Sequence, residues 1–240
     1  MNCKLVGNFV QHLEVILSPG EDFYAEKGAL IYLEDGIEFD VINRASGIKS
    51  FFKYKFLGES IYIIRYINNS FHDKKLVIGA KYGLLPIKSD NMVLACNGSY
   101  VASSAIANLS SVHAFNPGLG FMQNIDCKGT CFLDCKGTII PIHLKAKERL
   151  RMDENHLVAA IDMCPSQLRK SAWSLKNIKS GEGLSILEIT GPGTIYVESA
   201  PAEYTNGNSY SSHRGNNFTL GCIGTLIIYA LVFFFIWLFS

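Results

Sequence analysis

Residues 15–32 read VILSPGEDFYAEKGALIY, a β-rich run that a Pro-Gly turn and a turn at Gly28 divide into three short strands. The same order of apolar runs and turns returns in residues 85–102, LPIKSDNMVLACNGSYVA, and in residues 142–159, IHLKAKERLRMDENHLVA. Gly98 stands at the last turn of the second copy and Asn155 at that of the third. Because glycine and asparagine both tolerate a positive φ, we expect this turn to require one.

A second element recurs in the chain, since residues 125–133 match residues 189–197 as a strand, a tight turn and a strand. Further runs rich in Val, Ile, Tyr and Phe lie between turn residues, at 29–33, 60–67, 76–78, 92–95 and 194–198. One short helix is expected over Gln167–Ile178, after Pro165. The pattern predicts an all-β domain over residues 1–198, built of repeated strand–turn–strand units that stack around one shared core.

The C-terminal run FTLGCIGTLIIYALVFFFIWLF, residues 218–239, contains no charged residue. As a helix it would span roughly 33 Å, close to the hydrocarbon thickness of a bilayer. We therefore expect a transmembrane tail anchor, with residues 1–217 on the cytosolic side and residues 199–217 as a flexible linker rich in Ser, Asn and Gly. The side chains expected to contact lipid are Phe218, Leu226, Ile227, Tyr229, Phe234, Trp237 and Phe239.

Three stretches together resemble a known family: LSPGEDFYAEKGALIYL at 17–33, GES at 58–60 and GEGLSILEITGPGTIYVES at 181–199. They resemble the mitochondrial biogenesis family named for altered inheritance of mitochondria, in the tryptophan RNA-binding attenuator protein-like superfamily. The resemblance implies a double-stranded β-helix or β-roll, often assembled as a homotrimer. It also implies no established enzymatic activity and, for mitochondrial members, a role in inner-membrane architecture.

Charge gives little support for nucleic-acid binding. The net charge is +1, so no global field attracts a polyanion. The basic residues between Lys145 and Arg151 alternate in the manner of a solvated strand face. Lys53, Tyr54, Lys55 and Phe56 interleave cations with aromatic rings, but they also fit an ordinary strand. No nucleic-acid partner is expected.

Cysteine and histidine residues are the remaining candidates for chemistry. The chain has seven cysteines and no secretory signal, which indicates free thiols in a reducing compartment. Cys127, Cys131 and Cys135 are spaced as C-x3-C-x3-C, which departs from the usual zinc spacings and favours core packing. His143, with His113 and His156, is the other candidate for a metal ligand. No catalytic motif stands out, so neither an enzyme nor a cofactor is expected.

These observations predict a non-enzymatic, membrane-anchored scaffold that self-assembles and organises a membrane-associated complex whose protein partners the sequence does not identify. One alternative is a protein that binds a small ligand or metal in the roll interior, and another is an RNA-binding module. The length and hydrophobicity of the anchor favour the endoplasmic reticulum and membranes derived from it. The family resemblance favours mitochondria, and a prokaryotic plasma membrane is the third alternative.

Overall fold

The computed structural model describes residues 1–8, 10–44, 60–89, 92–112, 122–170 and 186–200, which belong to one compact unit, Met1–Glu203. The regular elements of these residues are β-strands and two short 3-10 helices, η1 (Glu154–His156) and η2 (Pro165–Gln167). The all-β prediction is therefore confirmed. Strand β1 (Asn2–Val6) precedes three consecutive sets of six strands, which we call the first, second and third repeats.

The strands of the three repeats have the following bounds. The first repeat consists of β2 (His12–Leu17), β3 (Asp22–Glu26), β4 (Leu30–Leu33), β5 (Ile37–Asn43), β6 (Tyr62–Asn68) and β7 (Lys74–Gly79). The second consists of β8 (Gly83–Ser89), β9 (Val93–Cys96), β10 (Tyr100–Ser103), β11 (Ala107–Ser111), β12 (Met122–Cys127) and β13 (Gly129–Cys135). The third consists of β14 (Ile139–Leu144), β15 (Arg149–Asp153), β16 (Leu157–Ile161), β17 (Leu168–Lys170), β18 (Ile186–Thr190) and β19 (Gly193–Glu198).

Strand pairing follows one rule in every repeat. The first strand pairs with the sixth, the second with the fifth, the fourth with the fifth and the third with the sixth, always antiparallel. The third strand also shifts register against the sixth at the same place each time, between Leu30 and Tyr32, Tyr100 and Ala102, and Leu157 and Ala159. The repeats seen in the sequence are therefore copies of one six-stranded unit.

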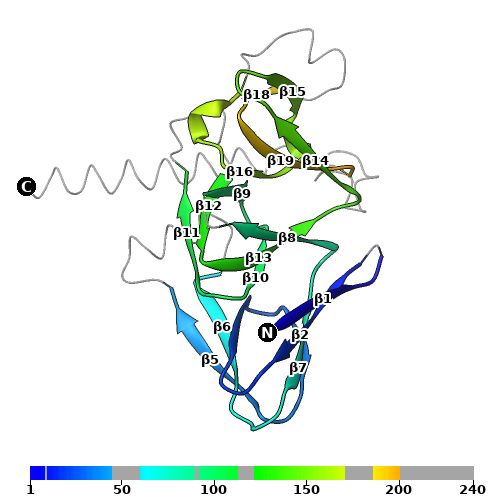
Figure 1. The fold of residues 1–240 in the computed structure, drawn as a ribbon, viewed down its shortest axis with the longest axis vertical. Helices are drawn as coiled ribbons and strands as arrows, with labels where there is room; N and C mark the ends of the chain where they lie inside the picture. The colour runs from blue at the N-terminus through cyan, green and yellow to red at the C-terminus, as the bar shows by residue number, and fades with distance from the viewer. Residues whose placement is uncertain (9, 45–59, 90–91, 113–121, 171–185, 201–240) are drawn as a thin grey trace, which may run out of the picture. The chain divides into compact units, whose positions relative to one another are not determined.

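Each repeat divides into two half-sheets of three strands, and neighbouring repeats combine their halves. Sheet A has the order β1-β2-β7-β4, and sheet B has the order β5-β6-β3-β10-β13-β8. Sheet C has the order β11-β12-β9-β16-β19-β14, and sheet D has the order β15-β18-β17. Figure 1 shows β1, β2 and β7 near one end of this succession and β15 and β18 near the other. Sheets B and C are thus each built from two repeats.

Two pairings join the repeats, β10 with β3 and β16 with β9. We call them the first and second joints. Each places two alanines opposite each other, Ala102 with Ala25 and Ala159 with Ala95, and all four are fully buried. Small side chains at these positions let core residues from both sides approach the paired backbones.

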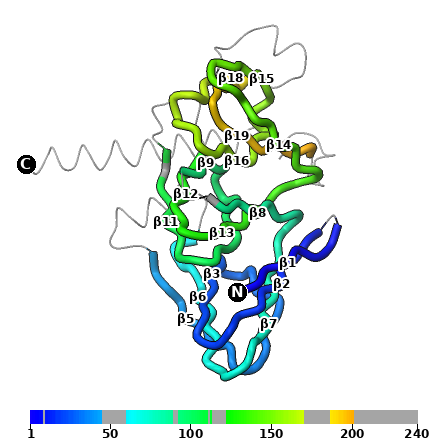
Figure 2. Tube along the Cα trace, in the orientation of Figure 1, coloured from blue at the N-terminus to red at the C-terminus, as the bar shows by residue number. Residues whose placement is uncertain are grey.

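The apolar interior consists of three clusters rather than one. The first lies between sheets A and B and includes Leu13 and Phe23; the second lies between sheets B and C and includes Leu133 and Ile125. The third lies between sheets C and D and includes Ile189. The prediction of one shared core is therefore wrong, because sheets B and C each contribute side chains to two different cores, one on either face. The path of the chain in Figure 2 follows this succession of repeats.

Two local predictions fail in the third repeat. Gly28 and Gly98 have positive φ values of 89° and 73°, as expected, but Asn155 lies in η1, because the Asp153 carboxylate accepts its N–H at 3.0 Å. The helix expected from Gln167 is also wrong over the described residues, where β17 pairs with β18. The remainder of that prediction, beyond residue 170, lies outside the described residues.

The turn between the first and second strands is the same in the first and third repeats. The Ser18 N–H donates to Glu21 Oε2 at 2.9 Å, and the Lys145 N–H donates to Glu148 Oε2 at 2.8 Å. Gly20 occupies the third position of this turn with φ +78°, and Lys147 occupies the equivalent position with φ +67°. This turn also divides the basic run, so that Lys145 and Lys147 do not share a strand with Arg149.

Exchanging the residue types at this turn should change stability in opposite directions. A Cβ at Gly20 would meet open space, so Gly20→Ala should lower the free energy of unfolding through backbone conformation alone, by about 1 kcal/mol. Lys147→Gly should raise it by a smaller amount, because glycine removes the same strain but gains freedom in the unfolded chain. Urea unfolding of both variants measures the two values. A destabilising Lys147→Gly would contradict this account of the turn.

Candidate functional site

Two strand edges stand out because their equivalents are paired elsewhere in the chain. Strands β10 and β16, the third strands of their repeats, and β3 and β9, the second strands of theirs, each have two neighbours in a sheet. Within the described residues, β4 pairs only with β7 and ends sheet A, while β15 pairs only with β18 and ends sheet D. These two strands are equivalent to the strands that form the two joints, but at that edge neither has a partner within the described chain. We call them the open edges.

The open edge at β4 carries apolar side chains that are buried in the other repeats. Leu30, Ile31 and Tyr32 are 37%, 56% and 47% exposed. Their equivalents in β10 and β16 are at most 8% exposed. Exposed apolar edge strands are sites where further strands add, because unpaired N–H and C=O groups lie beside the apolar side chains. The apolar sequence of β4 is therefore typical of a strand whose edge is covered by another strand.

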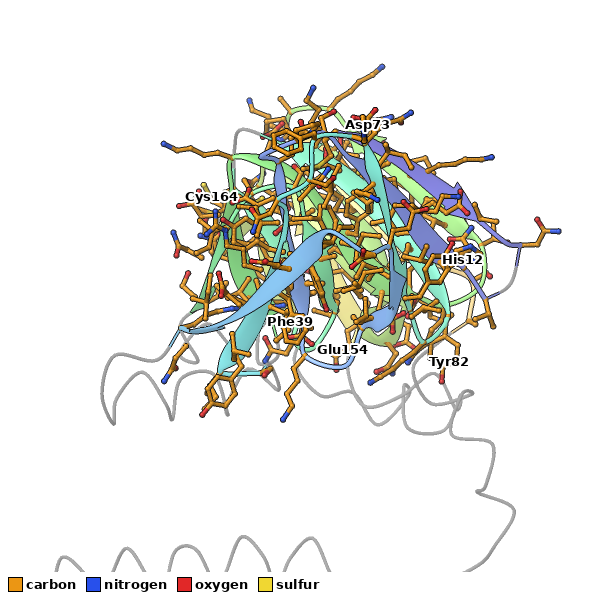
Figure 3. The ribbon with its side chains drawn as sticks, turned by 90° about the horizontal axis from the view of Figure 1, so that it is seen from below. His12, Phe39, Asp73, Tyr82, Glu154 and Cys164 are labelled. Carbon is orange, nitrogen blue, oxygen red and sulfur yellow. The ribbon has the colours of Figure 1, made fainter. Side chains whose placement is uncertain are left out.

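Exposed apolar side chains on β5 have a different explanation. Phe39, labelled in Figure 3, is 59% exposed. It packs against Tyr66, with ring centroids 6.4 Å apart. Strand β5 is the fourth strand of its repeat, and the fourth strand ends its sheet in all three repeats. Exposure on β5 thus follows from the topology of the unit, whereas exposure on β4 does not.

The internal joints define how the open edges would match. Ala102 opposes Ala25 and Ala159 opposes Ala95, and the equivalents of these pairs are Tyr32 on β4 and Met152 on β15. At the next position of the second joint, Ala160 opposes Leu94. The equivalent residues at the open edges are Leu33 on β4 and Arg151 on β15. If β4 met β15 of a second copy in this register, Tyr32 and Met152 would stand where the joints have two alanines, and an aromatic ring beside a thioether is a favourable cross-strand contact.

The cysteines proposed as possible metal ligands lie in the second core. Cys127, Cys131 and Cys135 are all buried there, beside Leu133. The pKa of Cys131 and that of Cys135 are both raised to about 12, and burial is the largest cause. The neutral thiols are consequently poor nucleophiles and poor ligands. Among the described residues, no three His, Cys, Asp or Glu side chains form a group able to hold a metal ion.

The histidine candidates do not come together in the described structure. His143 lies on β14 with Nδ1 2.9 Å from Thr194 Oγ1. His156 lies at the end of η1, and its Nδ1 is 2.7 Å from the carbonyl oxygen of Glu198. His113 lies outside the described residues, as do the RNA-binding candidates at 53–56 and the residues expected to contact lipid, from Phe218 to Phe239. No helix within the described residues is long and apolar enough to cross a membrane.

Two carboxylates that the sequence analysis did not single out hold the segments between repeats. Glu198 Oε2 accepts the N–H of Lys136 at 2.6 Å, and Asp134 Oδ1 accepts the N–H of Tyr82 at 3.3 Å. Burial is the largest cause that raises the pKa of each carboxyl group. The alignment of residues 125–133 with 189–197, extended by one residue, pairs these two acids and would have revealed them.

Replacing Glu198 should reveal the cost of its burial as a charge. Because its folded-state pKa is raised, the ionised carboxylate weakens the fold at pH 7, and that penalty declines as pH falls through the folded-state pKa. Glu198→Gln should therefore be more stable than the wild type at pH 7, with an advantage that shrinks towards pH 4.5. Urea unfolding at several pH values tests this, with Glu38→Gln as a control for removing one surface charge. Lower stability of Glu198→Gln at pH 7 would refute it.

Comparison with known proteins places the fold and the family. The crystal structure of protein SPYM3_0169 from Streptococcus pyogenes superposes with a TM-score of 0.65 at 20% sequence identity, covering 86% of this chain and 96% of that one. At this identity the likeness supports the fold alone. No curated protein matches the sequence. The family model described as mitochondrial biogenesis AIM24 matches residues 3–200, as the resemblance in the sequence predicts, and the chain therefore belongs to the AIM24 family.

Proposed function

We propose that this protein is a non-enzymatic scaffold that assembles with further copies of itself and organises a membrane-associated complex. The observation that carries the assembly is the pair of open edges. The β4 edge would pair with β15 of a second copy, as β10 pairs with β3 and β16 with β9 inside the chain. Such pairing would cover Leu30, Ile31 and Tyr32 and extend both terminal sheets.

The form of the assembly follows from the two edges being different. A contact between unlike surfaces either closes into a ring or continues as a filament. The family resemblance implies a homotrimer, so we propose that three copies close a ring through three equivalent joints. In the same proposal each six-stranded repeat is a short double-stranded β-helix, because its two half-sheets face each other across one core.

Attachment to a bilayer is the second part of the proposal. Residues 218–239 are long and apolar enough to span a membrane, and residues 199–217 have the composition of a flexible linker. Three such anchors on one assembly would bind a membrane far more tightly than one, because each insertion raises the effective concentration of the next anchor. An assembly held this way could gather partner proteins on one membrane surface.

The alternative of a ligand in the roll interior receives no specific support. Buried side chains, including Leu13, Leu133 and Ile189, occupy the spaces between successive sheets.

A charge exchange at the open edges tests the proposed assembly. Tyr32→Asp should weaken association between copies at least about tenfold, because a buried charge without a partner costs well over 1.4 kcal/mol. Adding Met152→Lys to the same chain should restore association, since the register places these residues opposite each other. Light scattering of the full chain in detergent measures the mass of each variant.

The matched control is Phe39→Asp, which introduces the same charge at an exposed aromatic residue on β5, away from both open edges. This variant should keep the mass of the wild type. A monomeric wild-type protein would refute the assembly. A stable assembly that Tyr32→Asp leaves intact would refute the edges as its contacts.

A further inference from the structure

The outer face of sheet D is built differently from its inner face. Leu168, Leu187 and Ile189 point into the third core and are almost fully buried. Side chains alternate along a strand, so the residues between them point away from the core. On β15, β17 and β18 these outward residues are mostly charged or polar: Arg149, Arg151, Arg169, Glu188 and Thr190.

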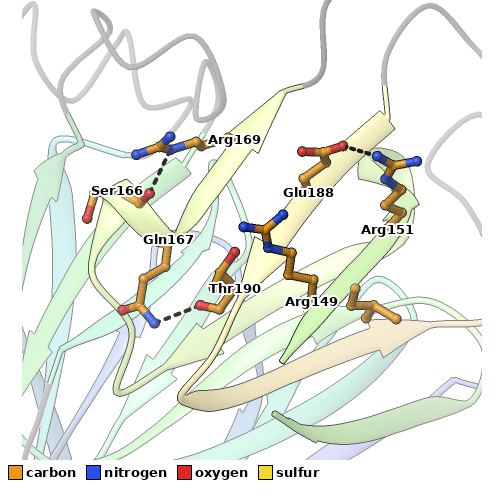
Figure 4. A pocket seen from close by; sticks show the side chains of 8 residues that line it. Arg149, Arg151, Ser166, Gln167, Arg169, Glu188 and Thr190 are labelled. Atoms are coloured by element: carbon orange, nitrogen blue, oxygen red, sulfur yellow. Dashed lines mark hydrogen bonds and ion pairs between the residues drawn. The ribbon is translucent and has the colours of Figure 1, made fainter. Parts of the chain in front are cut away.

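Strand register brings these side chains into two adjacent rows. Arg151, Glu188 and Arg169 form one row across the three strands, and Arg149 opposes Thr190 in the next row. Together with Ser166 and Gln167 they line a groove of about 410 Å³, seen from close by in Figure 4. This volume lies in the range of sites for small molecules.

The groove holds more positive charge than it neutralises. It contains three guanidinium groups and one carboxylate, a net charge of +2. Glu188 Oε1 pairs with Arg151 Nη2 at 2.8 Å, and Arg169 Nε donates to the carbonyl oxygen of Ser166 at 3.2 Å (Figure 4). Within the described residues, the guanidinium group of Arg149 forms no hydrogen bond or ion pair. Guanidinium donors are therefore available along the groove.

The equivalent face of the first repeat has the opposite charge pattern. There the central residue is Arg65, opposite Asp40, and it pairs with Asp22 at 2.9 Å. When the two repeats are aligned by strand register, Asp22 takes the place of Arg149 and Arg65 takes the place of Glu188. Asp40, opposite Arg65, takes the place of Arg169, opposite Glu188. The fold therefore does not require arginines on this face of the third repeat.

The first repeat also shows that this face remains accessible when a neighbour docks. The second repeat pairs with β3 in the first joint, yet the side chains of Arg65 and Asp22 are still 34% and 30% exposed. A second copy that paired with β15 would occupy the corresponding place. Access to the groove therefore does not depend on whether the chain assembles.

We propose that this groove binds the phosphate group of a small soluble molecule, held by Arg149 and Arg169 with Arg151 and Thr190 beside them. Guanidinium groups present paired N–H donors that match two oxygens of one phosphate, and a dianion balances the charge of +2. The limited volume and the polar side chains around it favour a small molecule over a broad membrane surface. Phosphate recognition here is a property separate from the proposed assembly.

Calorimetric titration of the full chain in neutral detergent with inorganic phosphate tests this proposal. We expect one phosphate per chain, with an affinity that falls as salt is added. Arg149→Gln and Arg169→Gln should each weaken binding about tenfold, because each removes a charge-assisted hydrogen bond to the phosphate. Arg149→Asp, which copies the first repeat, should abolish it. Lys4→Gln, an equal charge change on β1, should leave it unchanged.

Three outcomes would overturn the proposal. One is the absence of phosphate binding by the wild type, and another is equal weakening by Lys4→Gln and Arg149→Gln. The third is binding to phosphatidic acid vesicles, but not to phosphate, that is lost in the arginine variants, because it would make the groove a membrane contact. Circular dichroism of each variant confirms that the fold is retained, and light scattering monitors assembly separately.

Discussion

Backbone hydrogen bonding at strand edges is the constraint on which this fold depends. A half-sheet of three strands leaves edge N–H and C=O groups without partners, and each repeat contains two such half-sheets. The second strand of one repeat meets the third strand of the next, so one set of hydrogen bonds completes two halves at once. A linear series of repeats cannot satisfy every edge in this way. The third strand of the first repeat, β4, and the second strand of the last repeat, β15, therefore lie at sheet edges at the two ends of the series.

The joints also determine where apolar surface is buried. Because sheets B and C are shared by two repeats, each covers a core on both faces. Successive residues of β9 illustrate this, since Val93 and Ala95 belong to the second core while Leu94 belongs to the third. Backbone pairing and core packing therefore support each other: separating a joint would expose edge groups and open two cores. Cooperation of this kind is expected between stacked repeats.

Sequence patterns revealed the repeated unit but not its boundaries. Gly28 and Gly98 marked equivalent turns because positive φ strongly favours glycine, whereas Asn155 belongs to a 3-10 turn that the Asp153 side chain stabilises. The recurrence of one strand–turn–strand unit suggests copies stacked around a single core, but it does not show how many faces of each sheet are buried. The continuous apolar run Val93-Leu94-Ala95 was the available sign of burial on two faces. The expected helix after Pro165 failed because β18 provides a strand partner that local propensity does not include.

The candidate sites illustrate what a sequence without pairing information leaves undetermined. Leu30-Ile31-Tyr32 and Tyr100-Val101-Ala102 are similar apolar runs, and only the presence of a neighbouring strand makes one exposed and the other buried. Likewise, Arg149 and Arg151 read as an ordinary solvated strand face. Arg169 joins them only through β18, which follows it in the sequence yet lies between β17 and β15 in the sheet. Since all three repeats share one backbone plan, the differences between them, an apolar edge in the first and an arginine face in the third, are where specific function is to be sought.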